Sequence, residues 1–187
     1  MILAQFQTVG SDLFRRGLVS SHTGNMSIRL GDRIIITRRG SQLGNLKEQD
    51  LIETGLNKND RNTPLASVEL PAHRAIYQQT TALAVVHAHP PHAIALSMSE
   101  TEIVPNGADI RAEVGRVPVL GGDMDTSPGG LEDVISAGLK DHHIVMICSH
   151  GSFAAGQLLE EAYKYTAFLE ESSQVIWLVK TLDARRR

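Results

Sequence analysis

Ala84-Val85-Val86-His87-Ala88-His89-Pro90-Pro91 is an apolar run that carries two histidines and ends in two prolines. The apolar residues predict a buried strand, and the prolines predict its end. Side chains two residues apart in a strand point to the same face. We therefore expect His87 and His89 side by side where the strand stops, as half of a metal site. The alternative is a pair of structural histidines, because short motifs often occur by chance.

A third histidine, His150, follows the apolar run 144–148 and is followed by Gly151, which we expect to permit a sharp exit from that strand. Loops at strand ends form the crevice of open α/β sheets, so the three imidazoles are expected to meet there. A catalytic zinc ion has three protein ligands and one open position. Cys148 shares the face of His150 and is an alternative sulfur ligand, but we favour a core role for it because free cysteines are usually buried.

Glu69 is the candidate acid or base. We expect it in the first turn of a helix from Ser67 to about Gln79, with Ser67 as the N-cap. A helix dipole stabilises a carboxylate at that position, so the alternative role is structural. His73 is four residues further on and shares the same helical face. It is expected to act with Glu69 or, as we favour, to be a core or outer-shell histidine.

The composition is that of an ordinary globular protein, with 187 residues, 42% hydrophobic and 21% charged, and it predicts a single domain over residues 1–187. The net charge is −3, so we expect neither a nucleic-acid nor a membrane-binding surface. Cys148 is the one cysteine, and a reducing cytoplasmic location follows as an expectation. The N-terminus lacks the pattern of a secretory signal.

Strands and helices alternate along the chain after an initial hairpin. The expected strands cover 26–30, 33–37, 51–54, 83–89, 117–120 and 143–148, and 102–116 is expected to be irregular. The expected helices cover 1–16, 67–79, 92–98, Ser127-Pro128 to about 138, and 158–180, with 175–179 as an alternative terminal strand. This order predicts an α/β fold of three layers, α/β/α, around a mixed, largely antiparallel central sheet.

Five short motifs occur in a fixed order. They are Thr23-Gly24-Asn25-Met26-Ser27, Ile36-Thr37-x-x-Gly40, Ser67-x-Glu69-x-x-x-His73, His87-x-His89-Pro90-Pro91 and Ser149-His150-Gly151. In this order they resemble the class II aldolase/adducin family and, within it, the fuculose-1-phosphate aldolases. The resemblance runs through nearly the whole chain and implies a class II aldolase-like fold.

The resemblance also implies roles for single residues. His87, His89 and His150 would bind one Zn²⁺, or another divalent metal, in each subunit. Glu69 would be the catalytic carboxylate, which in the family can also approach the metal as a fourth ligand. Asn25, Thr37, Gly40 and Ser67 would hold a substrate phosphate. The family further implies a homotetramer with active sites between subunits.

Two departures from the family pattern concern the phosphate site. Arg38-Arg39 stands where the family has Pro-Ser, and Val68 replaces a serine. Arg38 is expected to replace the lost hydroxyl donors by a charge-assisted contact to phosphate. The alternatives are a different anion, such as a carboxylate, and a solvated loop. The family's acid is a tyrosine from a neighbouring subunit, and no tyrosine lies between His92 and Cys148, so the proton donor is unassigned.

The implied reaction is reversible retro-aldol cleavage of a phosphorylated ketose to dihydroxyacetone phosphate and an aldehyde. Zinc would stabilise the enediolate as a Lewis acid, and Glu69 would move a proton at carbon. The alternatives are a related sugar-phosphate epimerase or dehydratase, and a non-catalytic adducin-like module.

Overall fold

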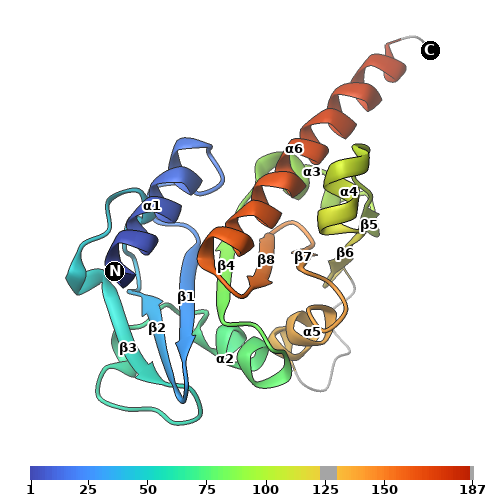
Figure 1. Ribbon diagram of the computed structural model, residues 1–187. Helices are drawn as coiled ribbons and strands as arrows, with labels where there is room; N and C mark the ends of the chain where they lie inside the picture. Colours follow the sequence, from blue (N-terminus) through green and yellow to red (C-terminus); the bar gives the residue numbers. More distant parts are fainter. Residues whose placement is uncertain (123–129, 186–187) are drawn as a thin grey trace.

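A mixed sheet with helices on both faces forms the centre of the computed structural model, which describes residues 1–122 and 130–185 (Figure 1). Its strands are β1 Asn25–Leu30, β2 Arg33–Thr37, β3 Leu51–Gly55, β4 Ala84–Ala88, β5 Glu102–Ile103, β6 Val117–Leu120, β7 Ile144–Ile147 and β8 Gly151–Gly156. The α-helices are α1 Ile2–Arg15, α2 Leu70–Gln79, α3 Pro91–Ser97, α4 Ala108–Val114, α5 Leu131–Gly138 and α6 Leu159–Ala184. Short 3₁₀ helices cover Leu43–Asn45, Glu48–Asp50 and Thr63–Leu65.

The eight strands lie in the order β3-β2-β1-β4-β8-β7-β6-β5. β6 and β7 run parallel, and the other neighbouring strands that the structure describes are antiparallel. The predicted mixed, largely antiparallel sheet is therefore confirmed. The strands that carry the histidine motifs, β4, β7 and β8, are adjacent near its middle.

The alternation of side chains along β4 separates two hydrophobic cores. Val85 packs with Ile76 of α2 and Ile135 of α5 on one face of the sheet. Val86 packs on the other face, in the core that also contains Leu169 of α6. Helices α2 and α5 thus cover one face, while α1, α3, α4 and α6 cover the other (Figure 1), which confirms the three-layer prediction.

Several element predictions need correction. Helix α2 begins at Leu70 and not at Ser67, because residues 67–69 form a turn before Pro71 enters the first helical turn. Helix α6 continues through 175–179 to Ala184, so the alternative strand there is wrong. The segment 102–116, expected to be irregular, contains β5 and α4. The predicted N-cap Ser127 lies outside the described residues, and α5 begins at Leu131.

Strand β8 was not predicted. Its sequence, Gly-Ser-Phe-Ala-Ala-Gly, has no β-branched residue and one aromatic, so its intrinsic preference for a strand is weak. It forms because it hydrogen-bonds to β4 on one side and β7 on the other. Tertiary pairing therefore overrides local propensity at this position.

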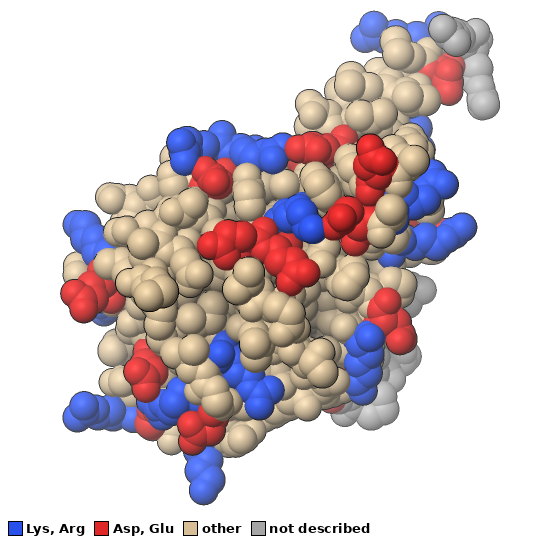
Figure 2. Space-filling view, viewed as in Figure 1, with Lys and Arg blue, Asp and Glu red and all other residues tan. Residues whose placement is uncertain are grey.

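Charges of both signs are interspersed on the face of the molecule shown in Figure 2. The C-terminal half of α6 extends away from the sheet (Figure 1) and carries exposed apolar side chains, including Trp177 and Leu182. Within the described ranges, no helix has both the length and the hydropathy of a membrane span.

Candidate metal centre and active site

Three histidines from two strand ends form one cluster. His87 lies near the end of β4, His89 lies just beyond that end, and His150 lies in the connection between β7 and β8. One ring nitrogen from each lies within 4.8 Å of those of the other two. The Nε2 atoms of His87 and His89 are 2.9 Å apart. The structure thus brings together the three residues that the sequence proposed as ligands.

A hydrogen bond to strand β8 orients His87. Its Nδ1–H donates to the carbonyl oxygen of Ser152 in β8, at 3.0 Å, which leaves the lone pair of Nε2 directed into the cluster. Such a partner on the remote nitrogen is typical of histidines that ligate metals. Burial lowers the pKa of His87 well below its usual value, and the neighbouring His89 and His150 lower it further. Burial also lowers the pKa of His89.

Neutral imidazoles are the form that binds metal ions. The Nε2 atoms of His87 and His89 face each other across 2.9 Å, and since His87 Nε2 carries no proton, either His89 donates to it or a cation lies close to both. The donor set therefore fits a divalent cation that prefers nitrogen ligands, such as zinc.

Glu69 adds a carboxylate to this cluster. Its Oε2 is 3.3 Å from His87 Nε2, and its Oε1 is 3.6 Å from His150 Nε2. It occupies the N-cap position of α2, and not the first turn as predicted. Burial raises the pKa of Glu69, whereas a hydrogen bond from Asn25 Nδ2 to Oε2, at 2.6 Å, and the electrostatic effect of the nearby His150 oppose that rise. A partly buried carboxylate beside an electrophilic centre is suited to general acid–base chemistry.

The turn that places His150 differs from the prediction. Ser149 is the residue in the left-handed region, with φ 58°, and its N–H donates to Ser97 Oγ at 3.0 Å. Gly151 is needed for a different reason, since a Cβ there would lie 2.5 Å from the Ala88 carbonyl oxygen and 2.9 Å from His89 Cδ2. A strained non-glycine residue next to a candidate ligand is typical of functional sites.

The histidine cluster forms one wall of a cleft of about 210 Å³. The residues that line it are His22, Thr23, Gly24, Asn25, Arg38, Arg39, Gly40, Ser67, Val68, Glu69, His87, His89 and His150. Of the predicted anion-binding residues, Asn25, Arg38, Gly40 and Ser67 are in this set. Sequence reasoning missed His22, Thr23 and Gly24, although Thr23 and Gly24 belong to the motif that contains Asn25.

The loop 38–41, here called the arginine loop, follows β2. Backbone hydrogen bonds hold it against residues 65–67, which precede α2. Arg39 N–H donates to the Leu65 carbonyl at 3.0 Å, and Ser67 N–H donates to the Thr37 carbonyl at 3.1 Å. Arg38 and Arg39 are exposed at the cleft, and neither forms an ion pair with a described residue. Two guanidinium groups are thus available to an anionic ligand.

Thr37 does not line the cleft. Its side chain is 1% exposed, and its hydroxyl oxygen accepts a hydrogen bond from Met26 N–H at 3.2 Å. Cys148 is also outside the cluster, because its thiol is directed at the Ser97 carbonyl, at 3.3 Å. Both side chains therefore form hydrogen bonds within the fold and do not belong to the histidine cluster.

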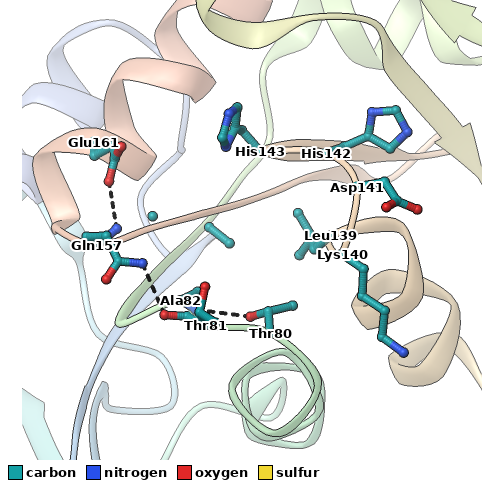
Figure 3. Close-up of a pocket in the computed structure, with 12 residues that line it drawn as sticks. Thr80, Thr81, Ala82, Leu139, Lys140, Asp141, His142, His143, Gln157 and Glu161 are labelled. Carbon is teal, nitrogen blue, oxygen red and sulfur yellow. Dashed lines mark hydrogen bonds between the residues drawn. The ribbon is translucent and has the colours of Figure 1, made fainter.

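A second polar cavity, of about 270 Å³, lies at the opposite end of the central strands (Figure 3). It is lined by residues before β4, before β7 and after β8, including Thr80, His142, His143 and Gln157. Glu161 at its edge already accepts hydrogen bonds from Gln157 N–H, at 2.6 Å, and from Tyr165. Its histidines belong to no group of described side chains that could hold a metal ion, so the candidate site is the histidine cleft.

Comparison with known proteins agrees with the resemblance that the sequence motifs indicate. The family model described as "Class II Aldolase and Adducin N-terminal domain" matches residues 4–177. An L-fuculose phosphate aldolase of Methanococcus maripaludis strain C7 is 31% identical, over 97% of this chain and 99% of that protein. A 3-oxo-tetronate 4-phosphate decarboxylase of Escherichia coli K12 is 28% identical, over 91% of this chain and 84% of that protein.

A solved structure also matches. The crystal structure of L-fuculose-1-phosphate aldolase from Thermus thermophilus has a TM-score of 0.90 and 33% sequence identity, and the match covers 98% of this chain and 96% of that chain. The fold, the order of the motifs and the matched length agree. This chain belongs to the class II aldolase and adducin N-terminal domain family.

Proposed function

We propose that this protein is a zinc-dependent aldolase that reversibly cleaves a phosphorylated ketose of the fuculose-1-phosphate type to dihydroxyacetone phosphate and an aldehyde. One observation carries the proposal. A three-histidine cluster, with Glu69 3.3 Å from His87 and 3.6 Å from His150, shares a cleft with two exposed arginines. Relatives named as L-fuculose phosphate aldolases support the same substrate class.

His87, His89 and His150 would hold the divalent cation, and Ser152 would keep His87 in the ligating tautomer through its carbonyl oxygen. When bound, the cation supplies Lewis-acid stabilisation of negative charge that develops on a substrate oxygen. All three ligands would be neutral, so the positive charge of the cation would not be offset by its ligands.

Glu69 would move the proton at carbon. When the carbon–carbon bond breaks, its electron pair stays with the ketose fragment, and that fragment needs a proton at the same carbon to become dihydroxyacetone phosphate. A Glu69 carboxyl gives this proton, and in the condensation direction the Glu69 carboxylate removes it. Burial raises the pKa of the Glu69 carboxyl, which suits a group that gives up and regains a proton, and the Asn25 hydrogen bond opposes that rise.

Arg38, Gly40, Ser67 and Asn25 would surround the substrate phosphate. Arg38 and Arg39 supply positive charge, and the loop around Gly40, with φ 71°, adds backbone donors. We propose that Thr37 contributes through the backbone position it gives this loop, because its hydroxyl is buried against Met26.

Cleavage also requires the hydroxyl that becomes the aldehyde to lose its proton. The group that takes this proton, which is the acid in the condensation direction, is proposed to come from a second copy of the chain in a homotetramer. All three tyrosines lie in described helices, Tyr77 in α2 and Tyr163 and Tyr165 in α6, and none of them lines the histidine cleft. The cleft therefore lacks a phenol from its own chain. We further propose a cytoplasmic enzyme, on the basis of its single unpaired cysteine.

A decarboxylase acting on a phosphorylated sugar acid is the second candidate. Two arginines at the cleft fit a substrate that carries a carboxylate as well as a phosphate, and one relative is named as a 3-oxo-tetronate 4-phosphate decarboxylase. Loss of carbon dioxide leaves the same kind of electron pair on carbon as retro-aldol cleavage. Epimerase and dehydratase activities remain further alternatives.

The test is a substrate comparison with the zinc-loaded full chain. Fuculose-1-phosphate and related ketose phosphates are assayed for dihydroxyacetone phosphate by a coupled NADH-consuming reductase. A 3-oxo acid phosphate is assayed in parallel for carbon dioxide. We expect metal-dependent formation of dihydroxyacetone phosphate that chelator treatment abolishes. Release of carbon dioxide without any aldol product would replace the aldolase proposal by the decarboxylase.

A further inference from the structure

Helix α2 and strand β1 place five polar side chains in one line beneath the cleft. Glu69, His73 and Tyr77 recur every four residues at the start and along one face of α2, while Asn25 and Ser27 share one face of β1. Four residues of helix rise about 6 Å, and two residues of strand rise about 6.8 Å, so the two rows stay aligned. His73 and Ser27 are fully buried, and Tyr77 and Asn25 are 1% and 6% exposed.

These side chains form a continuous series of hydrogen bonds. Tyr77 OH is 2.7 Å from Ser27 Oγ, and Ser27 Oγ is 2.6 Å from His73 Nδ1. His73 Nε2 is 2.5 Å from Asn25 Oδ1, and Asn25 Nδ2 donates to Glu69 Oε2 at 2.6 Å.

The direction of every bond in this series follows from its carboxylate end. Asn25 donates to Glu69 through its amide nitrogen, so its oxygen must accept, and His73 Nε2 must carry the proton. His73 Nδ1 then accepts from Ser27, which leaves Ser27 Oγ to accept from the Tyr77 hydroxyl. Burial lowers the pKa of His73 to about 3, so the ring is neutral and can play both parts.

We infer that His73 is a positioning residue for the proposed reaction: with Ser27 and Tyr77 behind it, His73 fixes the Asn25 amide so that one of its N–H bonds holds the Glu69 carboxylate beside the candidate metal-binding histidines. The role is positional and not a proton relay, because an amide between His73 and Glu69 cannot pass a proton without changing its covalent form. A buried amide is free to turn by 180° unless its oxygen and nitrogen have distinct partners, and His73 supplies that distinction.

The kinetic consequence of this inference rests on the proposed function. We expect His73→Leu to lower kcat by roughly 10- to 100-fold, the usual effect of losing a partner that orients an active-site group, while KM changes by less than about threefold. His73→Gln restores an amide N–H in place of the ring N–H and is expected to recover most of kcat. A role in packing alone predicts no such recovery.

Asn25→Asp is a second test, which is informative even if His73→Leu does not fold. It keeps the acceptor for His73 and removes the donor to Glu69, so it should lower kcat at least as far as His73→Leu. His143→Leu is the matched control, because His143 is stacked on Tyr165 near the opposite cavity, with ring centroids 4.7 Å apart. Unchanged kcat in His73→Leu, or equal losses in the leucine and glutamine variants, would overturn the inference.

A readout that needs no substrate separates this inference from the proposed function. In protein labelled with ¹⁵N-histidine, NMR should show His73 as the Nε2–H tautomer, with a slowly exchanging ring proton whose signal shifts in Glu69→Gln and stays in place in Glu53→Gln. An Nδ1–H tautomer, or no response to Glu69→Gln, rejects the positioning role even in an active aldolase. The expected signals in a protein that makes no dihydroxyacetone phosphate would leave the positioning role standing and reject the proposed reaction instead.

Discussion

Asn25 and His87 lie directly opposite each other across the antiparallel pair of β1 and β4. Residues opposed in this way point to the same face of a sheet, and here that face is covered by α2. The same register therefore places the residue that donates to Glu69 beside the first candidate metal ligand. A slip of one residue would turn Asn25 to the α6 face and separate the carboxylate from its partner.

Loss of a single histidine is expected to release the metal. His89→Ala removes one of three nitrogen atoms that lie within 4.8 Å of one another, so the purified variant should lose stoichiometric zinc in elemental analysis. His142→Ala, in the opposite cavity, should keep the zinc content of the wild type. Equal zinc in both variants would remove His89 from the ligand set.

Neutralising Glu69 should separate metal binding from catalysis. Glu69→Gln keeps the shape of the side chain and loses the proton-transfer group, so we expect zinc to stay bound and kcat to fall by about 10²- to 10⁴-fold. Glu53→Gln is the matched control, because Glu53 is an exposed partner of Arg33 on β3. Full turnover by Glu69→Gln would remove the proton-transfer role.

Removing the side chains of Arg38 and Arg39 is expected to weaken substrate binding. The double variant Arg38→Ala/Arg39→Ala removes both exposed guanidinium groups at the cleft, and KM for a phosphorylated ketose should rise about 10- to 100-fold with little change in kcat. Arg61→Ala, an exposed arginine outside that cleft, serves as control. Steady-state kinetics that show an unchanged KM would mean that the loop is only solvated.

Gly151→Ala should destabilise the fold as well as the site. The added Cβ would meet the Ala88 carbonyl oxygen at 2.5 Å, and we expect a loss of about 1–3 kcal/mol in the free energy of unfolding, measured by urea denaturation. Gly107→Ala is the control, since its Cβ would have no neighbour closer than 3.8 Å and should change stability by less than about 0.5 kcal/mol. Equal stability of the two variants would contradict the close approach of β8 to β4.

The free energy of unfolding of the metal-free protein should fall in mild acid, because His73 is buried in its neutral form. Its pKa is lowered from 6.5 to about 3 by burial, so below pH 6.5 the unfolded chain binds a proton that the folded chain does not. Stability from this residue is therefore complete above pH 6.5 and is lost as the pH falls toward 3, at up to about 1.4 kcal/mol per pH unit. Urea denaturation across this range should show a shallower loss for His73→Gln than for wild type. Identical pH slopes would contradict a neutral, buried His73.

Local patterns in the sequence were enough for much of the site. The spacing of His87 and His89 at a strand end, and the four-residue interval from Glu69 to His73, are short-range features that a strand and a helix convert directly into shared faces. The order of the predicted strands and helices likewise predicted the layers around the sheet. The roles assigned to the ligands, the phosphate site and the zinc ion remain proposals that the variants above test.

Other features depended on contacts between residues far apart in the chain. Strand β8 exists because β4 and β7 flank it, and Thr37 is withdrawn from the cleft because its hydroxyl meets Met26. The left-handed turn at Ser149, in place of the expected turn at Gly151, is fixed by Ser97 of α3. Neither propensity nor spacing encodes such pairings, so these residues could not be placed from the sequence.

The sequence by itself therefore indicated which faces of their elements the candidate side chains occupy, because those faces follow from periods of two and four residues. The tertiary structure alone decided which of these faces meet. It joined Asn25 to Glu69 and His150 to His87 through strand register and the order of strands in the sheet, which are set by burial of the two cores and by hydrogen bonds between distant segments.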